Sequence, residues 1–99
     1  MDDHSPTPPT LTLWRMVDCD LCTQARDLLH HVLTERAAAG LPRPTLVERD
    51  LAEDPSAQRD LFDRIPVLEL EGRRLDLAVR IGPIRAFLAE TLDEAGPAR

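Results

Sequence analysis

The chain has no lysine, no tyrosine and few aromatic residues of any kind. All 12 of its basic residues are therefore arginines, which excludes a lysine nucleophile and a Schiff base formed on lysine. The aromatic residues are Trp14, Phe62 and Phe87. We expect an aliphatic core of Leu, Val, Ile and Ala, because these are the apolar residues left to fill it.

The chain also lacks an excess of positive charge and a long apolar run. Its formal net charge is −6 at pH 7. A nucleic-acid binder needs a basic surface for phosphates and aromatic side chains for base stacking, so nucleic acid is not an expected partner. No apolar run reaches the roughly 18–20 residues of a membrane-spanning helix, so no membrane attachment is expected. The first ten residues are acidic and proline-rich, unlike a secretory signal, which predicts a cytoplasmic protein.

The length of 99 residues suits one domain. Residues 1–10 carry three prolines and no apolar pattern, and residues 94–99 are similar. We expect both segments to be mobile tails. The folded domain is therefore predicted to span residues 11–93.

Hydrophobic periodicity predicts the order β-α-β-α-β-β-α for this domain. The predicted elements are strand 11–17, a long helix over 20–39, strand 44–51, a short helix from 54 to about 63, strands 66–70 and 73–77, and a last helix opening at 82–83. Gly40 and Pro42 mark the end of the long helix, and Asp54 with Pro55 marks the start of the short one. An α/β domain with a four-stranded mixed sheet flanked by helices follows.

The two predicted amphipathic helices each have one apolar face. The expected buried positions are Leu21, Ala25, Leu28, Leu29, Val32 and Leu33 in the long helix, and Ile84, Phe87, Leu88, Thr91 and Leu92 in the last one.

The two cysteines, Cys19 and Cys22, are the residues with the clearest chemistry. In a reducing compartment such a pair is more typical of catalysis, redox sensing or metal binding than of a structural disulfide. Cys19 falls between the first strand and the long helix, where unpaired amides and the helix dipole favour a thiolate. Cys22 is one helical turn further on and more deeply set. We therefore predict Cys19 as the attacking thiol and Cys22 as the resolving thiol.

A metal site is the alternative use of a Cys-x-x-Cys pair. Zinc needs four ligands, and the chain has no third cysteine. His4 lies in the predicted tail, while His30 and His31 lie two to three turns along the helix, roughly 12 Å or more from Cys22. We expect His30 and His31 on a solvated helix surface, and no metal ligand is predicted.

Two stretches resemble the glutaredoxin-like family within the thioredoxin superfamily: LTLWRMVDCDLC at residues 11–22 and RIPVLELEGRRL at 64–75. The likeness extends over residues 11–92 and is nearest to short bacterial members of unassigned substrate. It implies a thioredoxin fold with the strands in the order second, first, third, fourth. It also implies a cis bond before Pro66, which turns the backbone of Ile65 towards a bound peptide or thiol.

The chain departs from glutaredoxins where they bind glutathione. Asp20 and Leu21 replace the usual proline and aromatic residue, and residues 78–83 (AVRIGP) lack the usual glycine pair and acidic residues. Arg15 lies about one position from the family's basic residue. Asp18 and Asp20 flank Cys19, where carboxylates oppose a thiolate and repel anionic glutathione. Asp20 also has the favourable sign for a first helical turn, so its net effect stays open.

The expected function is thiol–disulfide oxidoreductase, reducing the disulfide of a protein or of a low-molecular-weight thiol. No bound cofactor is expected, and glutathione is one candidate co-substrate. A reductase or thiol pool would recycle the protein, which is expected to be a monomer. The alternatives are an ordinary glutathione-dependent glutaredoxin, a homodimer bridging a metal or iron–sulfur cluster through Cys19, and a thioredoxin-fold module without catalytic activity.

Overall fold

The structure, a computed structural model, describes residues 7–93. The predicted C-terminal tail, residues 94–99, and residues 1–6 of the predicted N-terminal tail lie outside the described residues. Thr10 belongs to the predicted tail, but in the structure it is the first residue of the first strand. Its pairing with Thr45 of a neighbouring strand gives Thr10 a regular partner.

The elements follow the predicted order. They are β1 (Thr10–Arg15), α1 (Asp20–Ala38), β2 (Thr45–Asp50), a 3-10 turn (Leu51–Glu53), α2 (Pro55–Leu61), β3 (Val67–Leu70), β4 (Arg73–Leu75), α3 (Ile81–Leu88) and a π-helical turn (Ala89–Asp93). None of the helices in residues 7–93 combines the length and apolarity needed to cross a membrane.

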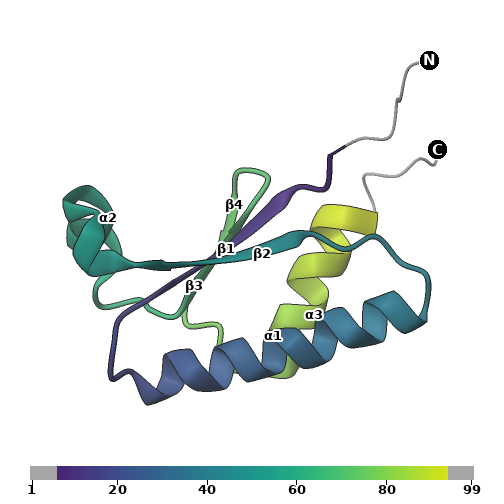
Figure 1. Ribbon diagram of the computed structural model, residues 1–99, viewed down its shortest axis with the longest axis horizontal. Coiled ribbons are helices and arrows are strands. Elements are labelled where there is room, and N and C mark those ends of the chain that lie inside the picture. Colours follow the sequence, from purple (N-terminus) through teal and green to yellow (C-terminus); the bar gives the residue numbers. More distant parts are fainter. Residues whose placement is uncertain (1–6, 94–99) are drawn as a thin grey trace.

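The four strands form one mixed sheet in the order β2-β1-β3-β4. β1 runs parallel to β2 and antiparallel to β3, while β3 and β4 form an antiparallel hairpin. Helix α1 is the crossover between the two parallel strands (Figure 1). This is the arrangement of the thioredoxin fold, and it confirms the predicted fold class and strand order.

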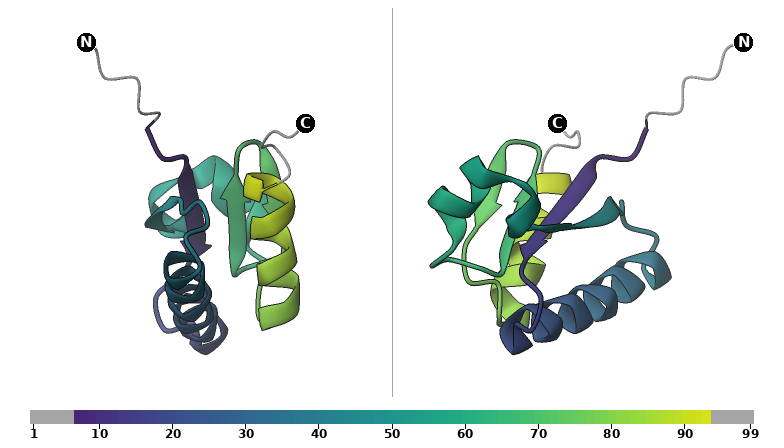
Figure 2. Two further views of the ribbon diagram at one scale, coloured as in Figure 1. Left: turned by 90° about the vertical axis from the view of Figure 1, so that its right-hand side faces the viewer. Right: turned by 60° about the vertical axis from the view of Figure 1, so that its left-hand side comes forward.

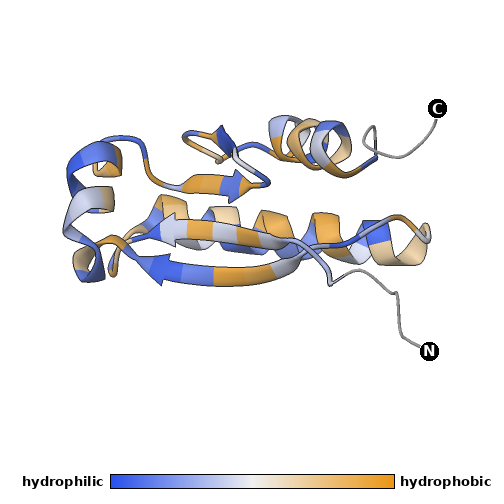
Figure 3. Ribbon diagram, turned by 90° about the horizontal axis from the view of Figure 1, so that it is seen from above, coloured by the Kyte–Doolittle hydropathy of each residue, from blue (hydrophilic) through white to orange (hydrophobic). Residues whose placement is uncertain are grey.

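The main core lies between one face of the sheet and the two helices α1 and α3. Leu11 and Leu13 of β1 are fully buried there, as are Leu68 of β3 and Ile84 of α3. The alternation of apolar and polar residues along β1 is visible in Figure 3, whereas β2 changes from apolar to charged residues along its length. Central strand β1 therefore holds the core together, and β2 is a more exposed edge.

A smaller cluster covers only part of the opposite sheet face. Trp14 and Val67 pack there against Leu51 of the 3-10 turn and Leu61 of α2. The Trp14 Nε1 donates to the Glu69 carboxylate at 3.0 Å. Helix α2 lies at the end of the sheet, apart from α1 and α3 (Figure 2). This small cluster therefore lies against the strand ends nearest the β1–α1 connection.

Helix boundaries follow the predicted capping residues. The Asp54 carboxylate accepts from the Ala57 N–H at 3.0 Å, and Pro55 is the first residue of α2. Gly40 follows the C-terminal end of α1 with a φ of 72°, in the left-handed region that favours glycine.

Three sequence-based expectations need correction. The first strand ends at Arg15 rather than at residue 17, and the fourth ends at Leu75 because the chain then turns sharply, with Leu77 at φ 51°. Leu21 was placed on the buried helix face but is 48% exposed. The buried stripe instead passes through Cys22, which lies about 100° further around the helix.

Arg36 is a charged residue within the buried face of α1, with a side chain only 6% exposed. Its Nε donates to the Pro42 C=O at 2.8 Å. Both terminal nitrogens donate to the carboxylate of Asp93, in the last helical turn described. A second pair, Arg85 with Glu35, joins α3 to α1, and its hydrogen bonds lower the pKa of the Glu35 carboxyl.

We expect Arg36→Ala to lower the free energy of unfolding by about 1–3 kcal/mol, because it removes the donor of charge-assisted hydrogen bonds to Asp93 and of the hydrogen bond to the Pro42 C=O. Urea denaturation followed by circular dichroism measures the change. The matched control is Arg26→Ala on the same helix, whose side chain is 38% exposed and should contribute less than about 0.5 kcal/mol. Equal losses in the two variants would contradict the assigned role of Arg36.

Candidate functional site

Cys19 is the N-cap residue of α1, as predicted from its position between a strand and a helix. Its backbone is extended, and its Sγ accepts from the Cys22 N–H at 3.1 Å. The preceding residue, Asp18, has a φ of 58°, which turns the chain from β1 into the helix. The sulfur of Cys19 thus lies at the positive end of a 19-residue helix, where negative charge is stabilised.

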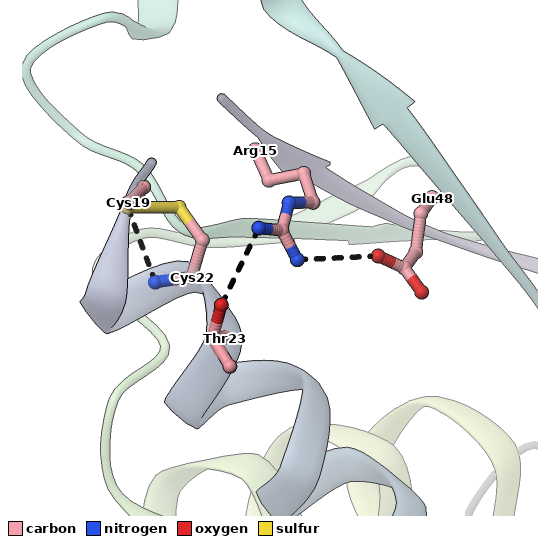
Figure 4. The surroundings of a disulfide bond; sticks show 5 residues. All are labelled: Arg15, Cys19, Cys22, Thr23 and Glu48. Atoms are coloured by element: carbon pink, nitrogen blue, oxygen red, sulfur yellow. Dashed lines mark hydrogen bonds and ion pairs between the residues drawn. A yellow bond between two sulfur atoms is a disulfide. The ribbon is translucent and has the colours of Figure 1, made fainter. Parts of the chain in front are cut away.

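Cys22 has no exposed surface, whereas Cys19 is partly exposed. The two residues are bonded as a disulfide, with their Cα atoms 5.2 Å apart. Figure 4 shows the bond at the start of α1, together with the hydrogen bond to the Cys22 amide. The geometry gives one sulfur accessible to a partner and one protected by the fold.

Figure 4 draws Arg15 between the disulfide and Glu48. Arg15 extends from the end of β1 and donates to the Thr23 hydroxyl in the first part of α1 at 3.4 Å. Its other terminal nitrogen lies 3.4 Å from the Glu48 carboxylate of β2. With a side chain only 18% exposed, Arg15 of β1 is held between β2 and the first turn of α1.

Pro66 lies at the same end of the sheet as Cys19. Trp14 pairs with Val67, so the residue before Val67 is next to the point where β1 leads towards α1. The Ile65–Pro66 peptide bond is cis, as expected. The Pro66 C=O accepts from the Ala78 N–H at 2.8 Å, but no backbone hydrogen bond within residues 7–93 uses the N–H or C=O of Ile65.

The remaining predicted candidates lie where the sequence placed them. Asp18 and Asp20 are exposed on either side of Cys19. His30 and His31 are exposed further along α1, and His31 pairs with Glu35 of the same helix. In residues 7–93 no group of three or more His, Cys, Asp or Glu side chains is arranged to hold a metal ion.

The sequence reasoning missed the contacts of Arg15 with Thr23 and Glu48. A signal was present in the alternation of β1. Arg15 follows Leu11 and Leu13 at two-residue steps, so its side chain lies on the same face of the sheet, the one covered by α1. Because Arg15 is the last residue of β1 on this face, its side chain reaches the first turn of α1.

No protein-family model matches the chain, and no curated protein is significantly similar to it. Two structures of one protein are among the solved structures that are similar to the chain. The X-ray structure of Northeast Structural Genomics target protein XcR50 from X. campestris is 30% identical, with a TM-score of 0.64, and the match covers 88% of this chain and 99% of that one. The solution structure of XcR50 is 29% identical, with a TM-score of 0.61, and the match covers 90% and 97% of the two chains. The chain therefore belongs to the same family as XcR50 from X. campestris.

Proposed function

We propose that the protein is a thiol–disulfide oxidoreductase of the glutaredoxin-like kind. The observation that carries the proposal is the asymmetry of the dithiol. Cys19 is partly exposed at the N-cap of α1 and accepts a backbone hydrogen bond, whereas Cys22 is fully buried one turn away. An attacking thiol must reach its substrate and carry charge, and a resolving thiol must wait until a mixed disulfide has formed.

In the first step, the Cys19 thiolate attacks one sulfur of the substrate disulfide. A new sulfur–sulfur bond forms to Cys19, the substrate bond breaks, and the departing thiolate takes up a proton. The Cys22 N–H and the helix dipole stabilise the thiolate before the attack. Asp18 and Asp20 oppose it, so the helix terminus must outweigh two neighbouring carboxylates.

In the second step, Cys22 loses its proton and attacks the Cys19 sulfur of the mixed disulfide. The second half of the substrate leaves as a thiol, and the protein keeps the Cys19–Cys22 disulfide. Two electrons have passed from the dithiol to the substrate. A thiol pool such as glutathione, or a reductase, returns them.

Two further groups support the proposal. The guanidinium of Arg15 contacts Thr23 near the start of α1 and is partly balanced by the Glu48 carboxylate 3.4 Å away. The positive charge that remains favours thiolate forms of the dithiol. The N–H and C=O of Ile65 are positioned next to the cis Pro66 without backbone partners among the described residues. An extended substrate backbone can pair with them as an added strand would.

We further propose that the protein acts in the cytoplasm as a monomer. The thiols of a reducing compartment re-reduce the disulfide after each reaction, so a Cys-x-x-Cys pair stays in its reduced, reactive state there.

The decisive experiment supplies bis(2-hydroxyethyl) disulfide, a neutral small disulfide, with NADPH and one of two recycling systems. One system is glutathione with glutathione reductase, and the other is thioredoxin reductase. Turnover with either supports the proposal and identifies the reductant, whereas absence of thiol release even from the pre-reduced protein contradicts it. Visible absorbance and iron content of freshly purified protein test for the cluster-bridging homodimer instead.

Cys19 should be the more reactive thiol of the reduced protein. With limiting iodoacetamide, peptide mapping should find Cys19 alkylated at least about tenfold faster than Cys22, because only Cys19 is accessible and stabilised as a thiolate. In urea the difference should largely disappear, which is the control for intrinsic reactivity. Preferential labelling of Cys22 in the folded protein would reverse the assigned roles.

The two steps should be separable by substitution. With a disulfide substrate, Cys22→Ser should stop at a stable mixed disulfide on Cys19, and mass spectrometry should show the added half-substrate. The mass of the wild type should instead fall by two hydrogen atoms relative to the reduced protein, because a Cys19–Cys22 disulfide forms within one chain. Cys19→Ser should form neither the mixed disulfide nor the intramolecular one. A disulfide-linked dimer as the main wild-type product would be incompatible with the mechanism.

A further inference from the structure

Strand β2 has one edge with which no other described strand pairs. It is the outermost strand of the sheet, next to β1, and Figure 3 shows it at the outside. It pairs with β1 along all six of its residues, Thr45–Asp50, and the register has no bulge. A free edge of this kind presents a row of N–H and C=O groups to which a further strand can add.

One hydrogen bond shows which backbone groups of β2 point outward. The Thr45 N–H donates to the Pro9 C=O at 2.8 Å, so the backbone groups of Thr45 face β1. The direction of these groups alternates along a strand, so every second residue after Thr45 also faces β1. The residues between them, Leu46, Glu48 and Asp50, therefore direct their N–H groups away from the sheet. Outside the ladder with β1, no backbone hydrogen bond within residues 7–93 uses those N–H groups.

β2 lacks most of the features by which edge strands avoid pairing. It contains no proline and no lysine, and it is as long as the central strand β1. The protection that it does have is a run of three charged residues, Glu48, Arg49 and Asp50.

These charges disfavour a second copy of the chain as the added strand. Two copies related by a twofold axis pair antiparallel, and with one continuous sheet face the two longest registers are centred on Val47 and on Glu48. The first register places Leu46 opposite Glu48, and the second places two Glu48 side chains opposite each other. The edge therefore suits a strand of a different sequence.

The side chains of β2 on the α1 side of the sheet indicate which sequence fits. Leu46 packs against the main core there, so Glu48 and Asp50 lie on the same side. Glu48 is 37% exposed, and Arg15 balances part of its charge from 3.4 Å. On this side an added strand would meet one apolar residue and two carboxylates at two-residue steps.

The side chains on the other side of β2 add no free positive charge. The Arg49 Cζ lies 4.5 Å from the centroid of the Trp14 ring, and Arg49 Nη2 lies 3.8 Å from the Asp54 carboxylate. Arg49 is therefore turned towards the protein. Val47, on the same side, is 39% exposed and offers an apolar contact.

We infer that the free edge of β2 binds an extended, basic segment of another protein as a fifth, antiparallel strand. The segment would carry Lys or Arg opposite Asp50 and Glu48, followed by apolar residues opposite Val47 and Leu46. Main-chain hydrogen bonds would supply affinity, and the two carboxylates would supply the preference for a basic sequence. The surface contains neither a cysteine nor Pro66, so the inference does not rest on the proposed function.

The first test uses a fluorescein-labelled peptide with the central sequence Lys-Thr-Lys-Val-Val and measures its fluorescence anisotropy with the full chain. In antiparallel pairing its lysines lie opposite Asp50 and Glu48, and its valines lie opposite Val47 and Leu46. We expect saturable binding that high salt weakens. Glutamate in place of both lysines should weaken binding at least about tenfold.

N-methylation of the peptide distinguishes an added strand from a loose electrostatic contact. The second lysine forms a hydrogen-bonded pair with Glu48, whereas the N–H of the threonine points away from β2. A methyl group on the amide nitrogen of that lysine should weaken binding at least about fivefold, because it removes a main-chain hydrogen bond. The same methyl group on the threonine is the control and should change binding less than about twofold.

A pair of variants tests the contribution of the β2 carboxylates. Asp50→Asn removes one charge but keeps the oxygen that accepts from the Ala52 N–H, and it should weaken binding of the lysine peptide about threefold. Asp27→Asn is the matched control, because it removes the same charge from an exposed side chain of α1 and should leave the affinity unchanged.

Amide hydrogen exchange, followed by nuclear magnetic resonance, locates the bound peptide. In the free protein the Glu48 amide should exchange at least about tenfold faster than the Val47 amide, because only Val47 donates to β1. Saturation with the lysine peptide should slow exchange at Glu48 at least about tenfold. The control is the amide of Arg74 in β4, the opposite edge of the sheet, which should not be slowed.

The inference is overturned if the lysine peptide does not bind, or if the glutamate peptide binds as tightly. Equal effects of the two methyl groups, or unchanged exchange at Glu48 in the saturated protein, overturn the added strand as well. Turnover of a disulfide substrate is measured separately, so failure of this inference and failure of the proposed function are distinguishable.

Discussion

The arrangement of the candidate site depends on how central strand β1 is held. Leu11 and Leu13 bury one side of this strand against α1 and α3, and its backbone pairs with β2 on one edge and β3 on the other. These contacts fix where β1 ends, and therefore where α1 begins. The antiparallel register with β3 brings Pro66 to the same end. The position of both cysteines relative to the cis proline thus follows from the packing of one strand.

Much of this arrangement could be predicted from sequence, because it depends on local patterns. Alternation identified β1, a capping aspartate with a proline identified α2, and the strand–helix junction identified Cys19 as a helix-capping sulfur. The ion pair of buried Arg36 with Asp93 could not be found in this way. The spacing of Leu29 and Val32 extends to Arg36 and places it on the buried helix face, but its partner is 57 residues away and no local pattern identifies it.

Leu77 shows a second limit of local patterns. The apolar–polar alternation of the fourth strand continues through Leu77 in the sequence, but the chain leaves the sheet after Leu75 and Leu77 takes a left-handed backbone. Asp18 has a similar backbone just before Cys19. Two non-glycine residues with positive φ therefore lie beside the cysteine pair and the cis proline. Departures from local preference are expected to gather where a protein functions, and sequence rules are least informative there.

The unequal exposure of the two sulfurs also has a consequence for oxidation of the two cysteines by peroxide. In the proposed reduced form, an oxidant in solution would reach Cys19 first and convert its thiolate to a sulfenic acid. Cys22 is protected from the oxidant, but its Cα lies only 5.2 Å from that of Cys19. It can condense with the sulfenic acid to form the disulfide and release water, before a second oxidation gives the irreversible sulfinic acid. In the proposed mechanism, the buried cysteine would thereby protect its exposed neighbour from irreversible oxidation.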